Sequence, residues 1–173
     1  IGEELLLKAE AVMSQNQVVI LSDYGKGVLG EGRAQRLIAS AKSAGIAVIV
    51  DPKGSNYGIY SGADVVTPNR KELCEATGMP VVSFDQVAGA ARTICRNHDV
   101  KAVLITLSQD GMILVRAEET HHLPAKTREV FDVSGAGDTV VATIAGAVAT
   151  GAELEDAGEP EQPHNNAPRA GSA

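Results

Sequence analysis

The sequence predicts an α/β fold in which helices cover both faces of a mainly parallel sheet, giving three layers. Short runs rich in Val and Ile alternate with segments of helical period, which is the pattern of strands joined by crossover helices. Apolar residues make up 44% of the 173 residues and aromatic residues only 3%, so the core must be aliphatic. Such a composition is typical of a parallel sheet that is buried on both sides.

The first part of the chain reads as two pairs of a helix followed by a strand. Apolar side chains recur at helical spacing over residues 5–13, and QVVILS at 17–22 has the composition of a buried strand. After a glycine-containing loop, residues 33–44 form an amphipathic pattern that Gly45 ends in the usual position for a helix-terminating glycine. The run IAVIV at 46–50 predicts a second buried strand.

The rest of the chain continues this alternation until a hairpin replaces the crossover. Gly78 and Pro80 stop one helix, and Ser83 is suited to cap the next. The expected elements are strands at 64–67 and 101–107, helices at 69–77 and 84–97, a hairpin of 112–116 with 120–123 at one edge of the sheet, and a small-residue helix at 135–150.

This arrangement also predicts where ligands bind. Strands joined by right-handed crossovers lie parallel, and their ligands bind beyond the carboxyl ends. Functional side chains are therefore expected in the loops after Ser22, Val50, Thr67 and Leu107, and just before the last helix.

Charge and cysteine content narrow the function class. The formal net charge of −7 makes the chain a poor candidate for binding nucleic acid or an anionic membrane. Cys74 and Cys95 lack the spacing of a zinc site and are read as reduced thiols in or near the core. No apolar run approaches the roughly 20 residues of a membrane span, and no leader is present, so a cytoplasmic location is expected.

The strongest chemical signal is the string DVSGAGD, which begins at Asp132 and ends at Asp138. Its glycine turn, directly before a helix, can point several backbone N–H groups into one concavity, which suits a phosphoryl group. Asp138 falls in the first helical turn, where the dipole favours the carboxylate that a general base needs. The alternative is a glycine turn in which Asp138 only complements the helix dipole.

This string resembles the carboxy-terminal signature of the ribokinase-like carbohydrate kinases, the PfkB family. The resemblance implies that Gly135, Ala136 and Gly137 line the anion hole and that Asp138 is the catalytic base. It also places Asp132 among the residues that bind phosphate or ATP. ATP and Mg²⁺ are the implied cofactors.

Two further motifs match that family. Asn69 and Glu72 resemble its N-x-x-E motif, which implies that both act on magnesium through water and that Asn69 also binds phosphate; the alternative is a helix capping box. Thr106, Ser108 and Gly111 lie where the family binds nucleotide phosphates, with Ser108 in place of the commoner Gly. Their alternative role is a turn in which Gly111 has a positive φ.

The segments LSDYGKG, VDPKG and TPNRKE resemble one branch of the family, the heptose-7-phosphate kinases of lipopolysaccharide core synthesis. Lys53 could then place its charge on the transferring phosphates, with Asp23 and Lys26 on the substrate side. Both lysines could also be solvated loop residues. The leading hypothesis is ATP-dependent phosphorylation of a sugar phosphate, heptose 7-phosphate, to the 1,7-bisphosphate.

Two alternatives remain open at this point. One is another kinase of the family, acting on ribose, fructose phosphate or a nucleoside; the other is a non-catalytic nucleotide-binding fragment. A dinucleotide-dependent oxidoreductase is disfavoured because no GxGxxG follows an early strand.

The resemblance covers about residues 12–156, which is only the carboxy-terminal part of such a kinase. The ribokinase-like fold is therefore expected to be incomplete, with its amino-terminal strands and sugar-gripping lid missing. Residues 1–157 are assigned to the kinase domain and 158–173 to a disordered tail. We expect the chain alone not to phosphorylate sugar, and its exposed strand edge to cause poor solubility or a homodimer.

Overall fold

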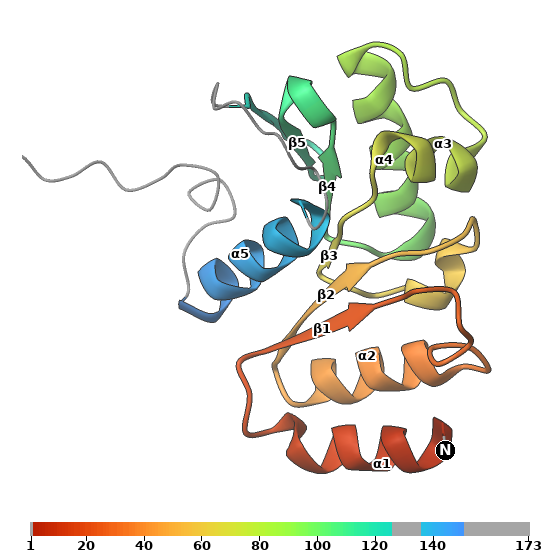
Figure 1. The fold of residues 1–173 in the computed structure, drawn as a ribbon, viewed down its shortest axis with the longest axis vertical. Coiled ribbons are helices and arrows are strands. Elements are labelled where there is room, and N and C mark those ends of the chain that lie inside the picture. Colours follow the sequence, from red (N-terminus) through yellow and green to blue (C-terminus); the bar gives the residue numbers. More distant parts are fainter. Residues whose placement is uncertain (1, 126–135, 151–173) are drawn as a thin grey trace, which may run out of the picture.

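The computed structural model describes residues 2–125 and 136–150 and shows a six-stranded sheet in the order β1-β2-β3-β4-β5-β6 (Figure 1). The first four strands are parallel, and β5 and β6 form an antiparallel hairpin that continues the sheet from β4. The mainly parallel sheet and the edge hairpin are thereby confirmed. The strands are β1 (Val18–Ser22), β2 (Ala47–Asp51), β3 (Val65–Val66), β4 (Ala102–Thr106), β5 (Met112–Val115) and β6 (Thr120–Leu123).

The helices lie on both faces of this sheet and make three layers. Among the described residues, two buried clusters lie between these layers: one joins the sheet to the first four helices, and the other joins it to α5. The predicted α/β class is confirmed. The helices are α1 (Gly2–Met13), α2 (Arg33–Ser43), α3 (Arg70–Thr77), α4 (Phe84–His98) and α5 (Ala136–Thr150), with short 3₁₀ turns η1 (Tyr57–Tyr60) and η2 (Ser108–Asp110).

Strand β2 shows why a strand of this sheet has apolar residues at successive positions. Val48 and Val50 are fully buried against the first cluster, whereas Ile49 between them is fully buried against the second. Successive side chains of a strand point to opposite faces, so a strand covered on both sides reads as a continuous apolar run.

The ends of α3 and α4 follow local capping rules. Asn69 and Glu72 form a complete capping box at the start of α3, and Gly78 ends that helix in the left-handed conformation. Ser83 and Gln86 form the same box at the start of α4. These helix boundaries are therefore set by local hydrogen bonds that the sequence could reveal.

Strand β1 lies at one edge of the sheet that the structure describes. Its Ile20 side chain is 43% exposed, although the strand has an interior composition. Among the described residues, no helix has both the length and the apolar character needed to cross a membrane.

Candidate functional site

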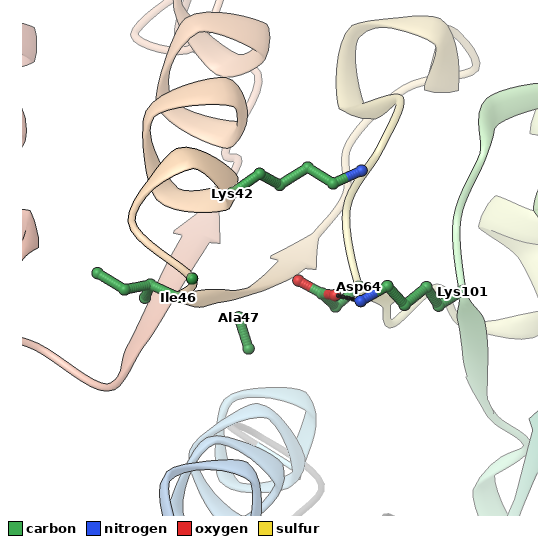
Figure 2. A pocket seen from close by; sticks show the side chains of 6 residues that line it. Lys42, Ile46, Ala47, Asp64 and Lys101 are labelled. Carbon is green, nitrogen blue, oxygen red and sulfur yellow. Dashed lines mark ion pairs between the residues drawn. The ribbon is translucent and has the colours of Figure 1, made fainter.

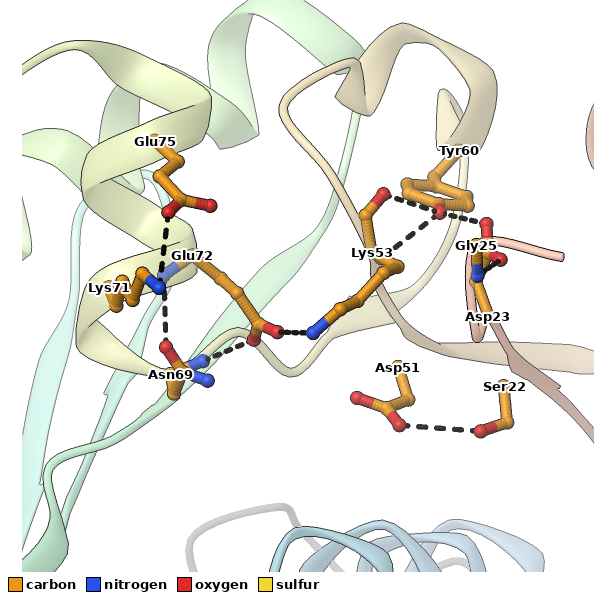
Figure 3. A network of polar contacts seen from close by, with 10 residues as sticks. All are labelled: Ser22, Asp23, Gly25, Asp51, Lys53, Tyr60, Asn69, Lys71, Glu72 and Glu75. Carbon is orange, nitrogen blue, oxygen red and sulfur yellow. Dashed lines mark hydrogen bonds and ion pairs between the residues drawn. The ribbon is translucent and has the colours of Figure 1, made fainter.

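The carboxyl ends of the parallel strands bring the predicted loops together at one edge of the sheet. Ser22 and Asp51 are paired residues at the ends of β1 and β2, and the Ser22 hydroxyl donates a hydrogen bond of 3.3 Å to Asp51 (Figure 3). Thr67, one residue past β3, is buried and bonds to the carbonyl of Val50. Backbone pairing between Asn69 and Thr106 joins the next loop to the end of β4.

The loop after β1 is tied to the loop after β2 by one hydroxyl. Tyr60 is fully buried, and its hydroxyl donates to Asp23 Oδ2 at 2.6 Å. The hydroxyl oxygen of Tyr60 also accepts the backbone N–H of Lys53 at 3.2 Å. Asp23 also accepts the N–H of Gly25 at 2.7 Å. Both oxygens of the Asp23 carboxylate therefore accept hydrogen bonds, and its position is set by two segments far apart in sequence (Figure 3).

Lys53 joins this cluster to the start of α3. Its ammonium lies 3.0 Å from Glu72 Oε1, while Glu72 Oε2 accepts the backbone N–H of Asn69 at 3.1 Å. The hydrogen bond and the charge of Glu72 raise the pKa of Lys53 above its ordinary value. Lys53 and Glu72, predicted separately, are thus direct partners, whereas Lys26 is an exposed residue of the loop after β1.

The oxygen donors at this edge fit a magnesium ion held through water. Glu72 and Asn69 present carboxylate and amide groups, the ligand types that Mg²⁺ prefers, and Asp51 lies at the end of the neighbouring strand. Within residues 2–125 and 136–150, no cluster of three or more acidic, His or Cys side chains forms a complete metal cage.

The loop after β4 is a tight turn with two unusual backbone conformations. Ser108 has φ +54 and Gly111 has φ +84, so Gly111 does have the positive φ of the alternative turn interpretation, and its phosphate-binding role stays a prediction. A Cβ on Gly111 would lie 2.1 Å from the carbonyl oxygen of Leu123, so only glycine fits. Arg70 from α3 pairs with Asp110 at 3.1 Å and holds the loop against that helix.

The signature string lies partly outside the described residues. Asp132 and Gly135 are not among them, and neither is the side chain of Asp138. The backbone of Ala136, Gly137 and Asp138 forms the first turn of α5, as predicted. Helix α5 packs against β1 and β2. The anion hole and the catalytic base remain predictions.

A different hollow lies at the opposite, amino-terminal ends of the strands. It has a volume of about 250 Å³ and is lined by Lys42, Asp64 and Lys101 (Figure 2). Lys101 is paired with Asp64, and Lys42 lies 3.7 Å from Asp99. This hollow lies at the end of the strands opposite the loops that carry the predicted site residues, so the carboxyl edge is the better candidate site.

Sequence reasoning did not identify Tyr60 as part of the site. The hydroxyl of Tyr60 and its partner Asp23 are 37 positions apart, so the contact leaves no local pattern in the sequence. The one available signal is Tyr60 itself, since a tyrosine in a buried apolar environment usually needs a hydrogen-bond partner.

Comparisons with known proteins agree with this geometry. The family model described as pfkB family carbohydrate kinase matches residues 2–159. The bifunctional protein HldE of Paramagnetospirillum magneticum is 60% identical over 158 residues, covering 91% of this chain and 32% of that protein. HldE of Acidiphilium cryptum is 50% identical over 155 residues, with 90% and 32% covered. The chain therefore spans about a third of the length of these relatives.

Solved structures show the same fold. Ribokinase of Arabidopsis thaliana, complexed with ribose and ATP, superposes with a TM-score of 0.75 at 27% identity, covering 87% of this chain and 49% of that one. Phosphofructokinase-2 of Escherichia coli, in complex with fructose-6-phosphate, gives 0.73 at 25% identity, with 91% and 53% covered. On the extent of the family match, together with this fold, the chain belongs to the pfkB family of carbohydrate kinases.

Proposed function

We propose that the chain is the phosphoryl-transfer part of an ATP-dependent kinase whose acceptor is heptose 7-phosphate. The single observation that carries this proposal is the meeting of Lys53, Glu72 and Asn69 at the carboxyl edge of a sheet against which α5 also packs. The 60% identity to a bifunctional HldE protein supports the choice of a heptose substrate. A cytoplasmic location belongs to the same proposal, because ATP is the phosphoryl donor.

Each residue then has a defined task. Asp138 accepts the proton of the acceptor hydroxyl, which attacks the γ-phosphorus, and the backbone N–H groups from Gly135 to Gly137 receive the negative charge that develops on the transferred group. Thr106, Ser108 and Gly111, with Asp132, line the nucleotide phosphates. When bound, Mg²⁺ supplies charge neutralisation for the phosphates, and Glu72 and Asn69 hold it through water.

Asp23 and Lys26 are the substrate-side residues of this proposal. Tyr60 and Gly25 occupy both oxygens of Asp23, so its carboxylate is held in one position before substrate arrives. Lys26 is exposed and lies three residues further along the same loop, where its ammonium can reach an anionic group. An acceptor that carries a phosphate suits this combination better than a neutral sugar does.

The test is an ADP-release assay with heptose 7-phosphate, ribose and fructose 6-phosphate. It should be run on the 173-residue chain and on a longer chain that supplies the other half of the domain found in the solved kinases. We expect turnover only in the longer chain, with preference for heptose 7-phosphate, and a fall of about 10²–10⁴-fold in the Asp138→Asn variant. Equal turnover of the variant would refute the base assignment.

A second candidate function is a nucleotide-binding fragment without catalysis. It is favoured by the share of the solved kinases that the chain covers, which is about half of their length. Nucleotide binding by the 173-residue chain without sugar-dependent turnover in either form would support it.

A further inference from the structure

Each oxygen of the Glu72 carboxylate already accepts a hydrogen bond from a group of this chain. Its Oε2 accepts the N–H of Asn69 as part of the capping box, and its Oε1 accepts the ammonium of Lys53 at 3.0 Å. The side chain of Glu72 is only 13% exposed, whereas that of Lys53 is 56% exposed. The cap uses one oxygen, and Lys53 covers the other, which faces the site.

The Lys53 ammonium lies among acidic side chains, with Glu72 in direct contact at 3.0 Å. Glu72, Asp51 and Glu75 all interact favourably with its charge. The neighbouring Lys71 belongs to a different pair, 3.7 Å from Glu75. Lys53 is therefore the cation that meets Glu72 on the side of the strand ends.

Only the side chain of Lys53 is free to change place. Its backbone N–H is bound to the Tyr60 hydroxyl, which is in turn held by Asp23. A lysine side chain is a flexible four-carbon stem with a point charge at its end. The ammonium can leave Glu72 while the loop after β2 stays where it is.

We propose that Lys53 competes with a divalent cation for Glu72. The ammonium neutralises Glu72 while no cation is bound, and a cation at Glu72 displaces it toward the phosphates of the nucleotide. This inference rests on the proposed function in taking Glu72 as the carboxylate for magnesium. Lys53 would then occupy the cation position in the empty site and bind the nucleotide phosphates in the filled one.

The test measures cation binding and needs no turnover. Mn²⁺ serves as a paramagnetic probe, and its binding to the 173-residue chain is followed by electron paramagnetic resonance, with Mg²⁺ as the competing ion. In the Lys53→Gln variant we expect Mn²⁺ to bind about fivefold more tightly, which corresponds to a partly exposed ion pair. Lys71→Gln removes the same charge from the same region and should change affinity less than twofold.

The Glu72→Gln background separates competition from general charge repulsion. Glutamine retains the capping role at this position but lacks the charge. The gain from Lys53→Gln should disappear in the double variant, because no carboxylate remains for which to compete. A gain that persists there, or one no larger than that of Lys71→Gln, would overturn the proposal.

The same measurements distinguish failure of the metal assignment of Glu72 from failure of the competition by Lys53. If Glu72→Gln leaves Mn²⁺ binding unchanged, then Glu72 is not the carboxylate for the metal, and both ideas are wrong. If Glu72→Gln weakens binding while Lys53→Gln has no effect, only the competition is refuted. The ADP-release assay reports on the kinase assignment independently of either result.

Discussion

Two tyrosines in one 3₁₀ turn allow a controlled test of how the site is held together. Tyr57 and Tyr60 are 1% and 0% exposed, and their rings pack edge to face with centroids 5.8 Å apart. The Tyr60 hydroxyl joins Asp23 to Lys53. Among the described residues, the Tyr57 hydroxyl has no hydrogen-bond partner. Replacing either residue by Phe removes one oxygen from a buried ring in the same turn.

The two variants should behave oppositely. Tyr60→Phe loses a hydrogen bond to a carboxylate, worth about 1.5–3 kcal/mol, and leaves the Lys53 N–H without its acceptor. We expect the free energy of unfolding to fall by about 2–3 kcal/mol, and the Tm to fall by roughly 4–10 °C for a chain of this size. Tyr57→Phe removes a buried hydroxyl that has nothing to bond, so stability should stay unchanged or rise by about 1 kcal/mol.

The assay is urea denaturation followed by circular dichroism, with the m-value compared between variants. An unchanged m-value shows that the midpoint reports stability rather than altered compactness. The reasoning is refuted if Tyr60→Phe lies within about 0.5 kcal/mol of both the parent and Tyr57→Phe. The Tyr60 hydroxyl would then not hold the two loops, and the fixed backbone of Lys53 would need another explanation.

Three further outcomes are expected. Gly111→Ala should lower the free energy of unfolding by about 3–5 kcal/mol in a urea titration, because the added Cβ would lie 2.1 Å from a backbone oxygen. Gly78 has φ +66 but open space around it, so Gly78→Ala should cost only about 1–2 kcal/mol in the same titration. Burial raises the pKa of Tyr57 and Tyr60, so stability should hold below the unfolded tyrosine pKa of about 10 and decline above it. In a Tyr24→Phe background, which removes the third and exposed tyrosine, tyrosinate absorbance should then rise together with loss of helical signal; ionisation of Tyr57 and Tyr60 in a folded chain would contradict this. Ile20→Lys should shift the chain toward monomer in sedimentation experiments, since it places a charge on edge strand β1; an unchanged association state would exclude that edge as the contact.

The fold could be predicted from local patterns because most of its elements are encoded locally. Strand β2 is an uninterrupted apolar run, and α3 begins at a capping box and ends at Gly78, so both were placed to within one residue. The 3₁₀ turns η1 and η2 were not predicted, because turns of three or four residues have no apolar period to detect.

The partners within the site could not be predicted in the same way. Topology indicates which loops share an edge, and it correctly brought the residues after β1, β2 and β3 together. It does not say that Lys53 meets Glu72 rather than solvent, because that contact depends on the rotamers of side chains 19 positions apart. Local spacing reveals a cap, whereas a bond between loops is visible only in three dimensions.

The motif at the start of α3 shows why a structural and a functional interpretation need not exclude each other. Asn69 and Glu72 form a complete capping box, so the structural interpretation is correct. The cap engages only Oε2 of Glu72, however, and Oε1 faces the strand ends, where it binds a cation of this chain. A carboxylate held by its own helix is pre-organised, since its position no longer depends on the ligand. The capping box therefore also fixes the oxygen that we propose for magnesium, and a Glu72→Gln variant that remains folded can separate the two roles.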